Sequence, residues 1–175
     1  MKYQDCAEAL QAVEEWSDGE ADGAVKLADA NINPRTGLAT DYLNHFNEAI
    51  MLLEMLGSSP ECIDDFLDWK PKSYREHFIG SRFKERHRAV AAYEAADTTV
   101  RSSLDTLAGT MTAVLEAARI AMRADLPPAA AQALAQKTVA SLKPLIARAG
   151  AVINGDGDAQ GGVATPQATV DRLLS

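Results

Sequence analysis

An uninterrupted helical pattern in the second half of the chain constrains the fold more than any other feature of the sequence. From Val100 to Ala121, apolar residues recur at alternating spacings of four and three. The positions are Val100, Leu104, Leu107, Met111, Val114, Ala118 and Ala121. Because one turn of an α-helix takes about 3.6 residues, this spacing produces a continuous apolar stripe. It predicts a helix over residues 98–123, about 39 Å long at about 1.5 Å per residue.

The residues that follow predict a partner for this helix. Pro127 and Pro128 mark a turn, after which apolar residues again share one face. These residues are Leu134, Val139, Leu142, Leu145 and Ile146. Pro144 lacks a backbone N–H, so we expect it to kink the second helix. The two stretches together predict an antiparallel, alanine-rich helical hairpin.

Shorter helices are predicted in the first half of the chain. Thr40 is a candidate N-cap, Gly57 a candidate stop, and Ser73 with Glu76 has the spacing of a capping box in a short turn that Gly80 closes. Apolar spacing and turn residues predict helices over residues 3–16, 22–30, 40–56, 60–69 and 81–96. Alternating runs typical of β-strands are missing. The expected fold class is therefore all-α, a helical bundle in which a compact N-terminal unit packs with the long hairpin.

Charge and aromatic content change along the chain. Residues 1–68 hold fifteen acidic side chains against three basic ones, and residues 69–96 hold seven basic against three acidic. Residues 97–175 hold seven of each sign. All ten aromatic residues lie between Tyr3 and Tyr93. The change near residue 96 therefore suggests two structural layers.

These layers are expected to form one domain. A single all-helical domain is predicted over residues 1–153, with an acidic, aromatic-rich unit at 1–96 and the hairpin at 97–153. Residues 154–175 combine a glycine-rich stretch, predicted to be a flexible linker, with a short helix from Pro166. Its apolar side would carry Val170, Leu173 and Leu174.

Composition excludes several protein classes. The 175 residues are 47% hydrophobic and 24% charged, which is typical of a folded globular protein. The N-terminus lacks the apolar run of a secretory signal, and no stretch approaches the ~18 apolar residues that span a bilayer. We therefore expect a cytoplasmic protein that does not bind membranes.

Motifs for catalysis or cofactor binding are missing from the sequence. Cys6 and Cys62 do not form a Cys-x-x-Cys pair, so we expect buried hydrophobic side chains rather than a redox or zinc motif. Neither a Gly-x-Ser-x-Gly elbow nor a phosphate-binding loop occurs. The sequence favours a non-enzymatic protein and points to no cofactor.

One cluster has the composition of a metal site. Asp41, His45 and Glu48 fall within about 60° of one another around a helix. An imidazole with two carboxylates suits a divalent transition metal. Further ligands are available at His77, Glu76, Glu85, His87 and Glu94. The alternative is that Asp41 favours the helix N-terminus, His45 pairs with Asp41, and Glu48 is solvated.

A basic stretch is the candidate site for a polyanion. Its cationic residues are Lys72, Arg75, Arg82, Lys84, Arg86 and Arg88, interleaved with Tyr74, Phe78 and Phe83. Such a mixture can bind phosphates and stack on bases. The net charge of −8 opposes long-range attraction to nucleic acid, so the alternative is that these residues balance acidic neighbours.

The apolar stripe of the hairpin is the candidate interface, centred on Leu104, Leu107, Met111 and Val114. Packing within the hairpin is the alternative role for these residues. The function that the sequence favours is a non-enzymatic helical interaction or regulatory protein, which acts through self-association or by binding a partner helix. The first alternative is a metal-binding sensor or enzyme, and the second is polyanion binding.

Overall fold

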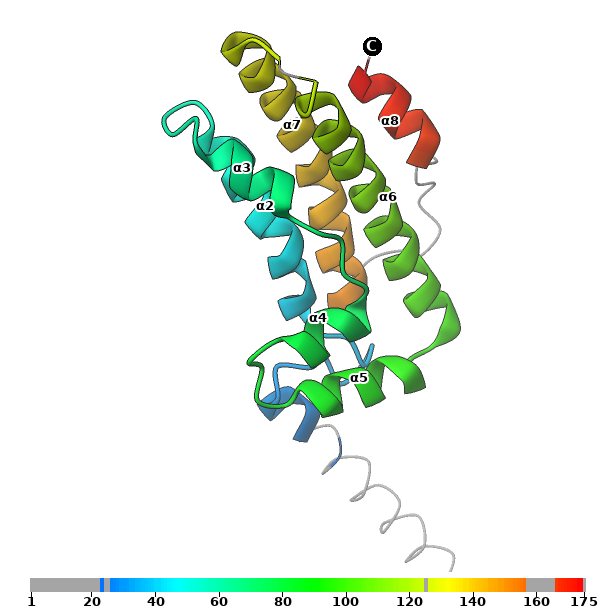
Figure 1. Ribbon diagram of the computed structural model, residues 1–175. Coiled ribbons are helices and arrows are strands. Elements are labelled where there is room, and N and C mark those ends of the chain that lie inside the picture. The colour runs from blue at the N-terminus through cyan, green and yellow to red at the C-terminus, as the bar shows by residue number, and fades with distance from the viewer. Residues whose placement is uncertain (1–22, 24–25, 125, 157–165, 175) are drawn as a thin grey trace, which may run out of the picture.

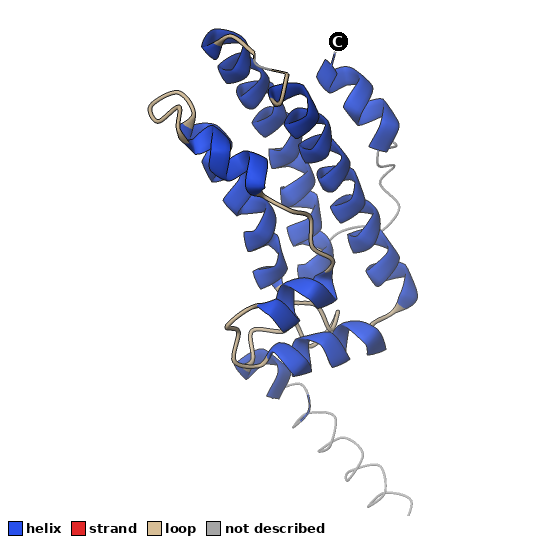
Figure 2. Ribbon diagram, viewed as in Figure 1, coloured by secondary structure: helices blue, strands red, loops and turns tan. Residues whose placement is uncertain are grey.

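The computed structural model describes residues 23, 26–124, 126–156 and 166–174. In this part of the chain the secondary structure is entirely helical, which confirms the predicted all-α class (Figure 2). Of the described helices, none combines the length and the apolar character that crossing a bilayer requires. The predicted helix at 3–16, Cys6, most of the glycine-rich stretch, and the side chains of Leu173 and Leu174 lie outside the described residues.

The two long predicted helices form the antiparallel hairpin (Figure 1). Helix α6 covers Thr98–Met122 and helix α7 covers Pro128–Asn154. Helix α7 continues as one helix through Pro144. Helix α2 (Asn44–Met55) packs against α7, and helix α8 (Pro166–Leu174) packs against α6. The hairpin is thus covered by one helix from the first half of the chain and by the last described helix.

Shorter elements close the rest of the bundle. The 3-10 helix η1 (Thr40–Leu43) leads into α2, and α3 (Cys62–Asp68) packs beside α2. Helices α4 (Tyr74–Gly80) and α5 (Arg86–Ala95) contact each other at the lower end of the bundle in Figure 1. The segment between α3 and α4 descends along the bundle and joins these two levels.

The apolar stripe of α6 is internal core. Leu104, Met111 and Val114 are fully buried, and Leu107 is 2% exposed. They join one hydrophobic cluster with residues of α2 and α7. These four residues were the candidate interface. In the structure they pack within the chain instead, because the neighbouring helices already cover the stripe.

Several predicted boundaries change for local reasons. The helix predicted from Ser81 begins at Arg86, because the Ser81 hydroxyl donates to the carbonyl of Phe78 and accepts from the N–H of Phe83. Thr40 is not an N-cap; it is the first residue of η1, which the extended backbone of Ala39 precedes. The helix predicted over 60–69 is α3, which begins at Cys62. The predicted capping box of Ser73 and Glu76 is confirmed, with both reciprocal hydrogen bonds present.

A tight turn near the start of the described chain holds the end of α7. The Arg35 guanidinium donates to the carbonyl of Gly155 at 2.6 Å, and the Thr36 hydroxyl donates to the carbonyl of Ile153 at 2.6 Å. These carbonyls belong to the last turn of a helix, where no N–H within the helix follows to satisfy them. Side chains from the first half of the chain therefore complete a helix of the second half.

Candidate functional site

The three residues of the predicted metal cluster have different surroundings. His45 is 3% exposed in α2, whereas Asp41 is half-buried in η1 and Glu48 is exposed. Asp41 accepts a hydrogen bond from Asn44 at 3.0 Å. Glu48 lines a surface hollow together with residues of α3. The helix spacing places the three residues on neighbouring parts of the chain, but tertiary packing buries one of them and leaves another in solvent.

His45 lies in an aromatic environment. Its ring stacks on Trp69, with centroids 4.7 Å apart and an interplanar angle of 19°. The indole N–H of Trp69 donates to the His45 carbonyl at 3.2 Å. Burial, with the charge of Lys72 as a smaller cause, lowers the pKa of His45 to about 4. The imidazole is therefore neutral at pH 7, and within the described part of the chain its Nε2 atom has no hydrogen-bond partner.

His77 from α4 approaches the same region. Its ring centroid lies 6.1 Å from that of His45, and its Nε2 atom lies 3.8 Å from a carboxylate oxygen of Asp41. Burial lowers the pKa of His77, and the neighbouring Asp41 opposes this effect. No group of three or more His, Cys, Asp or Glu side chains among the described residues is placed to hold a metal ion. Metal binding at Asp41, His45 and Glu48 stays a prediction that the described geometry does not support.

Two of the predicted polyanion-binding residues are engaged by acids of their own segment. Arg75 pairs with Glu94 at 2.6 Å, and Arg88 pairs with Glu85 at 3.2 Å. These acids belong to residues 69–96 rather than to the acidic first 68 residues. The arginines thus have local partners in α5 and beside its start.

The link between α4 and α5 presents the remaining basic side chains. Arg82 and Lys84 are exposed and Arg86 is half-buried; we call these three residues the basic turn. They make no ion pair with any described residue. Nearby, Ile79 is 44% exposed. The basic turn is therefore a cationic surface loop with an exposed apolar residue beside it.

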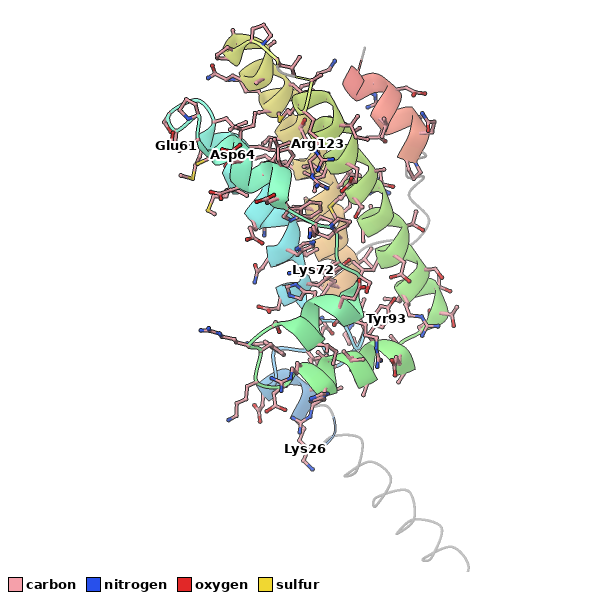
Figure 3. All side chains as sticks on the ribbon, in the orientation of Figure 1. Lys26, Glu61, Asp64, Lys72, Tyr93 and Arg123 are labelled. Carbon is pink, nitrogen blue, oxygen red and sulfur yellow. The ribbon has the colours of Figure 1, made fainter. Side chains whose placement is uncertain are left out.

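A hollow of opposite charge lies beside α3. It has a volume of about 380 Å³ and is lined by Glu48, Leu52, Asp65, Asp68, Trp69 and Lys72. We call it the acidic hollow, because three carboxylates face one ammonium. Glu61 and Asp64 add negative charge on the same stretch of chain, and Figure 3 shows them at the upper left of the bundle. None of the five carboxylates is in an ion pair with another described residue.

A second hollow, of about 460 Å³, lies on the other side of the 71–76 segment. Here the Tyr93 hydroxyl donates to both oxygens of Asp105, at 2.7 and 2.9 Å. Burial and the Asp105 carboxylate raise the pKa of Tyr93 to about 12. The hydroxyl therefore keeps its proton at pH 7 and holds the carboxylate in a fixed orientation.

Neither hollow was predicted from the sequence. Each is lined by residues from more than one helix, and periodicity within one helix carries no information about how separate helices meet. The acidic residues around Asp64 were visible as a charge run, but not the concave surface that they line. Comparisons of the chain with protein-family models, with curated proteins and with solved structures found no match. Function is therefore inferred from the side chains themselves.

Proposed function

We propose that this chain is a non-enzymatic interaction protein that self-associates head to tail, with the basic turn of one copy bound in the acidic hollow of the next. The observation that carries the proposal is the presence of both complementary surfaces on one chain. Figure 1 shows α3, which carries acids of the hollow, high on the bundle and the link between α4 and α5 at its lower end. The two surfaces are thus separated within one molecule and available to different neighbours.

The chemistry of the two surfaces supports this pairing. Arg82 and Lys84 are exposed cations without a described acidic partner, and Asp65 and Asp68 are exposed carboxylates without a described basic partner. Arginine pairs with carboxylates through two parallel hydrogen bonds, a geometry that favours specific docking. Trp69 also lines the hollow, but its ring is 6% exposed and stacks on His45, so the pairing depends on the carboxylates.

Long-range charge sets the conditions for this contact. The net charge of −8 makes two copies repel each other at a distance, whereas the local surfaces attract at short range. A head-to-tail contact forms a ring where the rotation between successive copies closes and an open chain where it does not. We therefore expect a mass in solution that grows with protein concentration.

Charge-reversal variants of the full chain test the proposal by light scattering at low salt. Arg82→Glu/Lys84→Glu makes the basic turn acidic, and Asp65→Lys/Asp68→Lys makes the hollow basic. Each variant alone is expected to be monomeric, because like charges then face each other. An equimolar mixture is expected to assemble again, because each reversed surface meets its complement.

The control keeps the net charge of the basic-turn variant and changes a different surface. Arg123→Glu/Lys137→Glu alters two exposed cations, one directly after the end of α6 and one in α7, and it is expected to self-associate like the wild type. Wild-type protein that stays monomeric at every concentration contradicts the proposal, as does association that survives both reversals. Monomeric protein that binds inorganic polyphosphate through Arg82 and Lys84 would replace it with polyanion binding.

A further inference from the structure

The second hollow has the size and the lining of a small-molecule site. Its volume of about 460 Å³ falls within the range of about 300–1,000 Å³ that is common for ligand pockets. Its walls come from the 71–76 segment, from Tyr93 of α5 and from residues 105–112 of α6. Figure 3 shows Tyr93 near the lower part of α6 and Lys72 above α4. It is independent of the proposed self-association surfaces, apart from Lys72, which lines both hollows.

Four charged side chains line this hollow, and two of them are already engaged. Arg75 is paired with Glu94, and Glu76 accepts the hydrogen bonds of the Ser73 capping box. Lys72 differs, because its ammonium makes no hydrogen bond or ion pair with any described residue. Asp105 also differs, because its described partner is the neutral hydroxyl of Tyr93. One cation and one anion that form no ion pair with a described residue therefore line the same hollow.

The wall of the hollow contains a glycine at a position where the structure leaves room for a side chain. Gly109 lies near the middle of α6, and a Cβ atom built on it would meet nothing within 4 Å. Glycine inside a helix is unfavourable relative to alanine, and no neighbouring group or backbone angle explains it here. Gly109 lines the hollow together with Ala108 and Thr112, so this part of the wall carries no side chain.

We infer that this hollow binds a small zwitterion of the α-amino acid class, with its carboxylate against the Lys72 ammonium and its ammonium against the Asp105 carboxylate. The Tyr93 hydroxyl orients Asp105 for that contact. Pro71 is exposed and supplies apolar wall for a side chain of the ligand, and the buried Tyr74 ring stacks on Tyr93 at 4.4 Å and so supports it. A ligand with both charges neutralises both protein groups at once, which a simple anion or cation does not do.

The test uses the full chain and the twenty free amino acids as probes. Thermal unfolding with each amino acid in excess identifies a stabilising ligand, because binding to the folded state raises the unfolding temperature. Isothermal titration calorimetry then gives its dissociation constant. At least one amino acid is expected to bind, and its decarboxylated amine and its deaminated acid are each expected to bind about tenfold more weakly or less well. If none of the twenty raises the unfolding temperature, the inference is wrong.

Variants locate the binding in this hollow. Asp105→Asn removes one charge at nearly constant shape, and Lys72→Met removes the other; each is expected to weaken binding about tenfold or more. Gly109→Leu places a bulky side chain on the wall of the hollow and is expected to abolish binding while circular dichroism shows a folded helical protein. Asp29→Asn, at an exposed carboxylate far from the hollow in sequence, is the control for loss of charge and is expected to bind like the wild type.

Affinity that is unchanged in Asp105→Asn and Gly109→Leu overturns the assignment. Both variants leave Arg82, Lys84, Asp65 and Asp68 intact, so failure here is distinguishable from failure of self-association.

Discussion

At the scale of single residues, His45 makes stability depend on pH. Its imidazole is stacked on Trp69 and buried neutral, with a pKa near 4 against an ordinary value of 6.5. Between these values the unfolded chain binds a proton that the folded chain does not, so the free energy of unfolding falls as the pH falls. The neutral His45 contributes fully to the free energy of unfolding above about pH 6.5, and roughly 3 kcal/mol of that contribution is lost by pH 4.

The measurement is urea unfolding of the wild type and of His45→Phe between pH 7 and pH 4. Phenylalanine keeps an aromatic ring against Trp69 and cannot take up a proton. The variant is therefore expected to lose less stability over this range than the wild type. His87→Gln, at an exposed histidine, is the control and is expected to follow the wild-type curve. Equal slopes for wild type and His45→Phe would contradict the assignment to His45.

At two glycines, substitution by alanine is expected to change the free energy of unfolding in opposite directions. Gly37 has a φ of +70°, and a Cβ atom there would lie 2.8 Å from the Ala92 carbonyl oxygen. Gly37→Ala is therefore expected to destabilise the fold by more than about 1 kcal/mol. Gly109→Ala is expected to stabilise it by about 1 kcal/mol, because the site is helical and open. Chemical denaturation of both variants checks the pair; destabilisation by Gly109→Ala would show that this position is not open.

At the scale of elements, helix α3 is held by a buried arginine of α6. The Arg119 side chain is 8% exposed, and its Nη2 atom donates to the carbonyl of Leu67 at 2.9 Å. Arg119 also pairs with Glu116 one turn earlier in α6. The carbonyl lies in the last turn of α3, where the helix dipole is negative, so a cation is favourable there. A short helix is in this way fixed to the long hairpin.

The apolar stripe of α6 gives the prediction at this scale. Leu107→Ala removes a buried side chain and is expected to lower the free energy of unfolding by about 2–5 kcal/mol. Ile120→Ala, in the same helix but 67% exposed, is the matched control and is expected to change it by less than about 0.5 kcal/mol. Denaturant unfolding followed by circular dichroism compares the two. A Leu107 variant that is as stable as the wild type but altered in oligomeric mass would instead make the stripe an interface.

At the scale of the whole molecule, the proposed association depends more on where the charges lie than on the net charge. The acidic hollow and the basic turn lie at different levels of the bundle, so a net charge of −8 coexists with a locally cationic surface. Exposed ion pairs are screened over a Debye length of about 8–10 Å near physiological salt. The proposed assembly is therefore expected to dissociate as the salt concentration is raised. The helical content is expected to stay the same, because the buried apolar core does not depend on exposed charge. A mass in solution that rises with salt would indicate apolar association instead.

The predictable part of this fold is its local part. The spacing of Leu104, Leu107 and Met111 was sufficient for α6, and the Ser73–Glu76 spacing was sufficient for the start of α4, because both depend on residues three or four apart. The sequence left alternatives open where a distant contact decides. Periodicity showed that the stripe on α6 is apolar, but not that α2 and α7 cover it. The spacing of Asp41 and His45 likewise did not show that Trp69 from another segment buries the imidazole.

The sequence by itself determined that the chain is all-α, which stretches form the hairpin, and where charge changes along the chain. Tertiary structure alone decided which apolar face is core, which cations stay without an acidic partner, and which side chains line the two hollows. The reason is the range of the interactions. Helix periodicity and capping act within a few residues, whereas burial and the solvation of charge depend on what packs against a side chain. Lys72 illustrates this, since it is one of several lysines in the sequence and lies between two hollows in the structure.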